Sequence, residues 1–131
     1  MGIANVLCIC IGASTGALIR WGLGLMLNSI FPTIPLGTLV ANLVGGFVMG
    51  VFMACSKHYA FFPEAVRLVI ATGFLGALTT FSAFSAEAVT LLSQEQYLWS
   101  SILIIAHVAG TILATILGIY SVKIFLGLGG V

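Results

Sequence analysis

The sequence predicts an all-α membrane protein with four transmembrane helices in each subunit, for two reasons. Apolar residues make up 61% of the 131 residues and charged residues only 5%, whereas a soluble domain has about 25% charged residues. The few charges also leave long uncharged runs, at 1–19, 21–56, 68–86 and 96–122. A membrane-spanning helix needs about 20 predominantly apolar residues, so four such helices use most of the chain.

We expect one transmembrane domain over residues 1–131, with helices at about 3–27, 36–55, 64–92 and 97–125. Pro32 and Pro35 mark the first connection, and the polar run 93–96 marks the third. Pro63 followed by Glu64 marks the start of the third helix, because proline is tolerated in a first turn and an acid suits the positive end of a helix.

Two glycine pairs lie on expected helices, Gly12 with Gly16 and Gly46 with Gly50. Small residues four apart share one helix face and let another helix approach closely. Each pair therefore predicts a face of tight helix packing.

The third helix is expected to be broken near its middle. Gly73 and Gly76 precede Thr79 and Thr80, and glycines and β-branched residues weaken a helix. A break within the membrane persists only where it is buried in protein or lines a cavity, and unwound carbonyls at such breaks are a usual cation site. We expect the break at 76–80 to be functional.

Isolated polar side chains inside apolar helices are candidates for a functional role, because placing a polar group in lipid costs free energy. Arg20 is either a fixed positive charge that attracts anions or an arginine that extends toward the interface. Asn42 can donate to an anion, although an interhelical hydrogen bond that only holds the fold is favoured for a single amide. Glu87 is either an acceptor near a pathway or a carboxylate that reaches the interface.

Two further groups have helical spacing. Phe81 and Phe84 share a face, and their positive ring edges suit an anion path, although packing is the commoner role of such pairs. His107, Thr111 and Thr115 recur every fourth residue. They form a polar stripe that predicts a solvated or pore-lining face, unless each hydroxyl bonds to the carbonyl four residues back.

The composition of the chain and the spacing of its polar residues also argue against a nucleic-acid-binding protein and against an enzyme. A net charge of +1 offers no phosphate-neutralising patch, so we expect no nucleic-acid partner. Ser85 and His107 lack a G-x-S-x-G elbow and an orienting acid, so we expect no enzyme activity.

The run GFLGALTTFSAFSAE at 73–87 resembles the third-helix signature of the Fluc (CrcB) fluoride channels. Residues 36–45 are similar to that family's second-helix motif, and the stretch from Gly12 to Arg20 is similar to its first-helix motif. The resemblance spans the whole chain, with one departure at Ala83, where the family usually has threonine.

This resemblance implies an antiparallel, dual-topology homodimer in the cell (inner) membrane. It implies passive export of fluoride through two pores, which confers fluoride resistance. It also implies one structural sodium ion at the centre of the dimer, held by backbone carbonyls that correspond to Gly76 and Thr79.

The resemblance also assigns residues to the fluoride pathway. Those on matching positions are Phe81, Ser82, Phe84, Asn42 and Arg20, and Glu87 closes the signature, while His107, Thr111 and Thr115 are similar in placement to the family's fourth-helix polar residues. Uncharged donors suit this role, because a pore must replace the water of a strongly hydrated anion and still release it.

Two other functions remain alternatives. A small four-helix multidrug/proton antiporter needs a membrane-embedded acid in the first helix, where this chain has Arg20. A non-transporting membrane scaffold would not need Asn42, a broken third helix and a polar stripe together. Four helices would also place Lys57, Arg67 and Lys123 on one side of the membrane, with Arg20 toward the other.

Overall fold

The computed structural model describes residues 2–58 and 62–127, and every regular element in these ranges is a helix. Four stretches are long and apolar enough to cross a membrane. They are α1 (Ile3–Leu27), α2 (Leu36–His58), a composite third span (Glu64–Ser93) and α6 (Tyr97–Phe125). The composite span consists of α3 (Glu64–Arg67), the π-helix η1 (Leu68–Leu75), α4 (Gly76–Leu78) and α5 (Phe81–Ser93). The predicted all-helical class with four membrane-length helices is confirmed.

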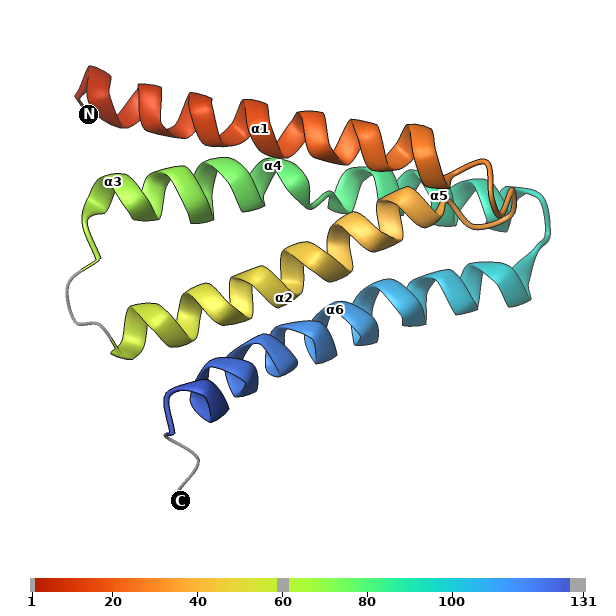
Figure 1. The fold of residues 1–131 in the computed structure, drawn as a ribbon. Coiled ribbons are helices and arrows are strands. Elements are labelled where there is room, and N and C mark those ends of the chain that lie inside the picture. Colours follow the sequence, from red (N-terminus) through yellow and green to blue (C-terminus); the bar gives the residue numbers. More distant parts are fainter. Residues whose placement is uncertain (1, 59–61, 128–131) are drawn as a thin grey trace.

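The helices pair into two layers (Figure 1). α1 lies along η1 and α4, and α2 lies along α6. The start of α1, the end of α2, the start of α3 and the end of α6 all lie at one end of the molecule. The α1–α2 and α5–α6 connections lie at the other end. The ends of α2 and α6 and the short helix α3, which carry Lys57, Lys123 and Arg67, therefore share one side, as expected.

The second helix is longer than expected, because it continues beyond Cys55 to His58. No proline or glycine stops it, and Lys57 and His58 in its last turn suit the negative end of the helix dipole. At the other end, the amide of Gly37 donates a 2.8 Å hydrogen bond to Oδ1 of Asn28, which closes the first connection.

Both glycine pairs bring backbones into contact, as predicted. Gly12 and Gly16 face the backbone of η1 and α4, and a β-carbon at Gly12 would lie 2.8 Å from the amide nitrogen of Phe74. Gly46 and Gly50 face α6 in the same way. The two layers therefore depend on positions where no side chain fits.

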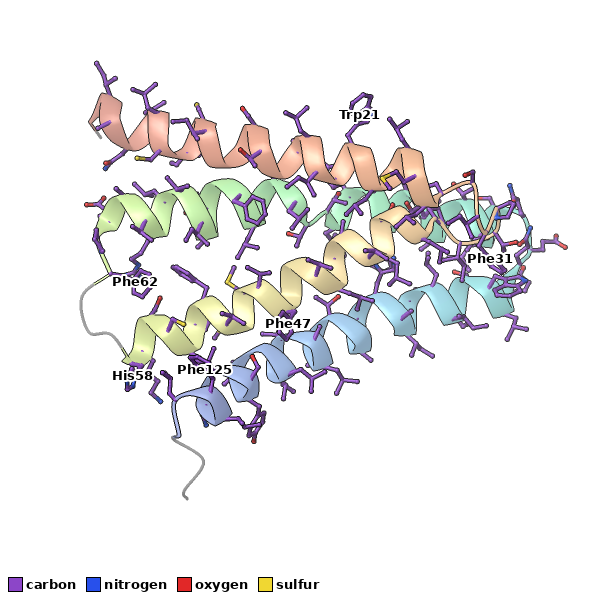
Figure 2. All side chains as sticks on the ribbon, viewed as in Figure 1. Trp21, Phe31, Phe47, His58, Phe62 and Phe125 are labelled. Carbon is purple, nitrogen blue, oxygen red and sulfur yellow. The ribbon has the colours of Figure 1, made fainter. Side chains whose placement is uncertain are left out.

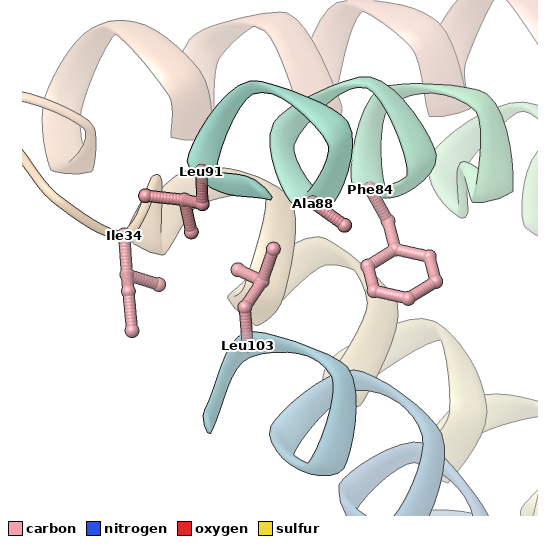
Figure 3. Close-up of a cluster of buried hydrophobic side chains, with 5 residues drawn as sticks. All are labelled: Ile34, Phe84, Ala88, Leu91 and Leu103. Atoms are coloured by element: carbon pink, nitrogen blue, oxygen red, sulfur yellow. The ribbon is translucent and has the colours of Figure 1, made fainter. Parts of the chain in front are cut away.

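Two small clusters of buried side chains join the layers. One contains Leu75 and Leu78 packed with Ala41 of α2. The other connects α5, α6 and the first connection (Figure 3), and consists of Ile34, Phe84, Ala88, Leu91 and Leu103. Most remaining large apolar side chains point outward, including Trp21 and Phe125 (Figure 2), which suits a surface that faces lipid.

Candidate functional site

The candidate site is built around two extended residues in the third span. α4 ends at Leu78 and α5 begins at Phe81, and between them Thr79 (φ −81°, ψ 152°) and Thr80 (φ −149°, ψ 115°) have extended backbone. Thr80 is the N-cap of α5, since its Oγ1 accepts a 3.1 Å hydrogen bond from the amide of Ala83. Threonine is a favoured N-cap residue, and the extended conformation is the usual one there.

Asn42 of α2 binds the backbone of Thr80 on both sides of the residue. Its Nδ2 donates to the Thr80 carbonyl at 3.1 Å, and its Oδ1 accepts from the Thr80 amide at 2.8 Å. Asn42 is buried. The amide thus forms the interhelical hydrogen bonds that the sequence favoured, and they replace helical bonds that extended backbone lacks.

Asn42 also determines the hydrogen-bonding state of His107. Because the Thr80 backbone orients the amide, its Nδ2 faces Nδ1 of His107 at 3.0 Å, and that ring nitrogen must accept. The proton of the neutral imidazole then lies on Nε2. This atom is buried and has no hydrogen-bond partner among the described residues.

The two phenylalanines lie in different environments although they are three residues apart. Phe84 is buried and stacks on His107, with ring centroids 4.7 Å apart and planes at 23°. Phe81 meets Phe84 edge to face at 5.4 Å and is 76% exposed. Phe84 is therefore packed inside the subunit, whereas most of the Phe81 ring lies on the surface of the subunit.

An open groove of about 430 Å³ runs along these residues. Among the predicted site residues that line it are Asn42, Gly76, Thr79, Phe81, Phe84, His107, Thr111 and Thr115. Arg20, Ser82 and Glu87 are not part of its wall. The fold thus brings most of the sequence-predicted residues into one cavity, from α2, the third span and α6.

The two threonine hydroxyls of the polar stripe on α6 donate hydrogen bonds to carbonyls of the same helix. Oγ1 of Thr111 donates to the carbonyl of His107, and Oγ1 of Thr115 donates to the carbonyl of Thr111 at 2.9 Å. This is the alternative that the spacing left open. The stripe lines the groove, but in this conformation its oxygens offer acceptors there rather than donors.

The two extended residues Thr79 and Thr80 interrupt the third span between α4 and α5. Arg20 contacts this interruption from the side opposite Asn42. Its Nε donates a 2.9 Å hydrogen bond to the carbonyl of Ala77, near the end of α4. A second cavity, of about 320 Å³, is lined by Arg20, Thr38, Thr80 and Ala83, among others. Thr80 lines both cavities, so the interruption separates an arginine-lined space from the groove.

Glu87 lies one turn beyond Ala83 and faces α2. Its Oε1 accepts a 2.5 Å hydrogen bond from Oγ1 of Thr38, and its Oε2 is buried without a partner among the described residues. Ser82 lies near the cap, with its Oγ 3.1 Å from Oγ1 of Thr80. Neither side chain enters the groove.

Two residues with clear roles in this geometry were absent from the predicted site. Thr38 bonds Glu87, and the backbone and hydroxyl of Thr80 organise the interruption. Thr38 precedes Asn42 by one helical turn in the uncharged run 21–56, and this shared face was the signal available for it. Thr80 was named only as part of the expected break at 76–80, and the signal for its own role was that a threonine can be the N-cap of a helix that starts inside the membrane.

A chain whose described residues form four apolar helical spans, with a groove among them that a few polar side chains line, is a multi-pass membrane protein. Residues 7–119 match the family model described as CrcB-like protein, Camphor Resistance (CrcB), and the chain belongs to this family. This confirms the resemblance found in the sequence.

Several curated relatives carry the name Fluoride-specific ion channel FluC. The protein of Nitrosospira multiformis is 50% identical over 94% of this chain and 96% of its own length. That of Pseudomonas paraeruginosa is 50% identical over 94% and 97%, and that of Chromobacterium violaceum is 52% identical over 89% and 93%. The chain is thus similar to these proteins over nearly its whole length.

Proposed function

We propose that this protein is a fluoride-selective ion channel, not an enzyme, that exports fluoride passively through two pores of an antiparallel homodimer in the cell (inner) membrane. The names of its relatives support this function. The observation that carries it is the groove at the interruption, where aromatic side chains and uncharged polar groups meet between apolar helices. A multidrug/proton antiporter or a non-transporting scaffold does not explain this combination of aromatic and uncharged polar side chains.

The chemistry of the groove suits a small, strongly hydrated anion. Phe81 and Phe84 line it, and the positive edge of an aromatic ring attracts an anion weakly. Nε2–H of His107 is a buried donor without a partner among the described residues. No lysine or arginine is among the residues that line the groove. Weak interactions of this kind allow an ion to shed water and still leave, which conduction requires.

A second copy of the chain would complete the groove. Gly76 is exposed, Thr79 and Thr80 are half-buried, and polar backbone is not stable against lipid. A β-carbon at Gly76 would meet only the carbonyl of Ala71, at 3.8 Å, so its own subunit leaves room for a side chain there. Close approach of another subunit explains both the glycine and the exposed ring of Phe81.

The antiparallel arrangement is open to a direct test. Single cysteines placed beside Phe81, in a background without Cys8, Cys10 and Cys55, should cross-link subunits of opposite orientation in membranes. Cross-links only between subunits of the same orientation would contradict it.

The backbone at the interruption suits a structural sodium ion held by Gly76 and Thr79 of both subunits. In a continuous helix the Gly76 carbonyl would accept from the amide of Thr80, and the Thr79 carbonyl from the amide of Ala83. Those amides donate instead to Oδ1 of Asn42 and Oγ1 of Thr80. Backbone oxygens released in this way are suitable ligands for sodium, which would supply a fixed positive charge and stabilise the dimer by mass action.

Proteoliposomes distinguish the proposed function from its alternatives. Vesicles with purified protein are loaded with fluoride or with chloride, and efflux is followed with ion-selective electrodes against protein-free vesicles. Fluoride efflux without chloride efflux supports the channel. Drug-coupled proton flux would indicate the multidrug/proton antiporter, and the absence of any transport would indicate the scaffold.

A further inference from the structure

A separate cavity of about 490 Å³ lies between the last turns of α2 and α6, at the end of the molecule where α1 begins. Its apolar lining includes Met53 on α2 and Ile119 and Val122 on α6. This cavity shares no lining residue with the groove at Asn42, so it needs an explanation of its own.

Basic side chains line the part of the cavity nearest the helix ends. Lys57 follows Met53 by four residues, and Lys123 follows Ile119 by four. In an α-helix this spacing places each lysine one turn further along the same face. On both helices the cavity therefore changes from apolar to basic in the direction from the membrane interior to its surface.

Both lysines are available to an external anion. They are exposed, and neither forms an ion pair with a carboxylate within residues 2–58 and 62–127. The Nζ of Lys123 lies over the ring of Tyr120, 5.4 Å from its centroid, a contact that orients the ammonium group and leaves its charge uncompensated. His58 also lines the cavity, and Figure 2 shows it at the end of α2.

We propose that this cavity binds an anionic phospholipid. The phosphate would lie between Lys57 and Lys123, and an acyl chain would follow the apolar surface of Met53, Ile119 and Val122. A free anion would use the lysines but not the apolar wall, whereas a zwitterionic lipid would use the wall but leave the two positive charges without a matching net charge. Basic pockets between transmembrane helices bind such headgroups in other membrane proteins.

Lipid binding to the full-length protein in detergent tests this site independently of ion conduction. Phosphatidylglycerol is titrated against the parent protein, and bound lipid is counted by native mass spectrometry. Phosphatidylcholine and inorganic phosphate serve as the zwitterionic and the lipid-free probes. The variants are Lys57→Gln, Lys123→Gln and their double variant, and the control is Arg67→Gln, an exposed cation near the same end that lies outside the cavity.

We expect saturable binding of phosphatidylglycerol that weakens about fivefold for each lysine removed, which corresponds to about 1 kcal/mol per charge. Arg67→Gln should bind like the parent. Unchanged affinity in the double variant would overturn the proposal, as would an equal loss in Arg67→Gln, which indicates only a diffuse charge effect. Competition by inorganic phosphate at the same concentration would identify a simple anion site and exclude the lipid.

Discussion

The carboxamide of Asn42 forms a hydrogen bond with each backbone polar group of Thr80, at 2.8 Å to the amide and 3.1 Å to the carbonyl. One side chain of α2 thus satisfies the residue at which the third span is extended. The remaining donor of the amide is directed at Nδ1 of His107, and Phe84 stacks on that ring. Backbone conformation, imidazole tautomer and aromatic position are therefore linked through a single amide.

Asn42→Asp should test this link, because aspartate keeps the acceptor for the Thr80 amide but loses both N–H donors. The Thr80 carbonyl would then lack its donor and face a carboxylate oxygen, and a buried unsatisfied group costs about 1–3 kcal/mol. We expect a lower Tm in detergent and slower fluoride efflux. The control is Asn28→Asp, whose side chain acts as an acceptor for Gly37, and it should be near neutral. Equal Tm values for the two variants would show that the donors of Asn42 do not matter.

Phe81→Ile and Phe84→Ile keep most of the apolar volume and remove the aromatic edge. If an anion at a ring edge gains as much as an aromatic pair, about 0.5–1.5 kcal/mol, each change should slow fluoride efflux about two- to tenfold. Dimer assembly, measured by size-exclusion chromatography, should survive in both. Phe84→Ile should lower Tm further, since only Phe84 is buried. Parental flux in both variants would leave packing as their only role.

Ala83→Thr should raise fluoride efflux roughly tenfold, if a hydroxyl there lowers the barrier by about 1.4 kcal/mol. Ala83 lines the cavity that also contains Arg20 and Thr80, so the added donor would face polar groups. The control is Ala86→Thr on the exposed side of α5, which carries the same cost in helix propensity. Equal rates for Ala83→Thr and its parent would show that the hydroxyl does not serve the ion.

Replacement of Na⁺ by a large organic cation should lower fluoride flux or dimer stability, because the carbonyls of Gly76 and Thr79 have lost their helical donors to Asn42 and Thr80. The measurement compares efflux and Tm in sodium and N-methylglucamine salts at constant ionic strength. Potassium is a useful intermediate case, since it differs from sodium mainly in size. Identical fluoride flux and Tm in all three salts would contradict the proposed sodium site.

Gly50→Ala should destabilise the fold by about 1–3 kcal/mol, the usual cost of overpacking. The new β-carbon would lie 3.1 Å from the amide nitrogen of Ile119 and closer still to the backbone of Thr115. Gly22→Ala is a matched control on α1, because nothing lies within 4 Å of its added carbon. The control should be neutral or stabilising, since alanine is the better helix former. A Tm of Gly50→Ala at or above that of the control would contradict the backbone contact.

The order and length of the spans could be predicted from the sequence because they depend on neighbouring residues. Uncharged runs of sufficient length indicate membrane helices wherever they occur, and glycines four apart mark a helix face without reference to a partner. The family, likewise, was recognisable from the contiguous run at 73–87. The prediction that failed locally was the end of α2, since the sequence around Cys55 and His58 contains no residue that stops a helix.

Tertiary structure alone decided which polar groups meet. Asn42 bonds residues 38 and 65 positions away, and no local pattern encodes the helix crossing that brings them together. For the same reason, spacing placed Phe81 and Phe84 on one face but did not reveal that only Phe84 is buried. Arg20 had two possible roles by sequence, and the packing of α1 against α4 selected the carbonyl of Ala77 as its partner. Sequence determined the helices and their faces, whereas long-range packing determined the hydrogen bonds among them, because a buried polar group must be satisfied by whatever the fold places beside it.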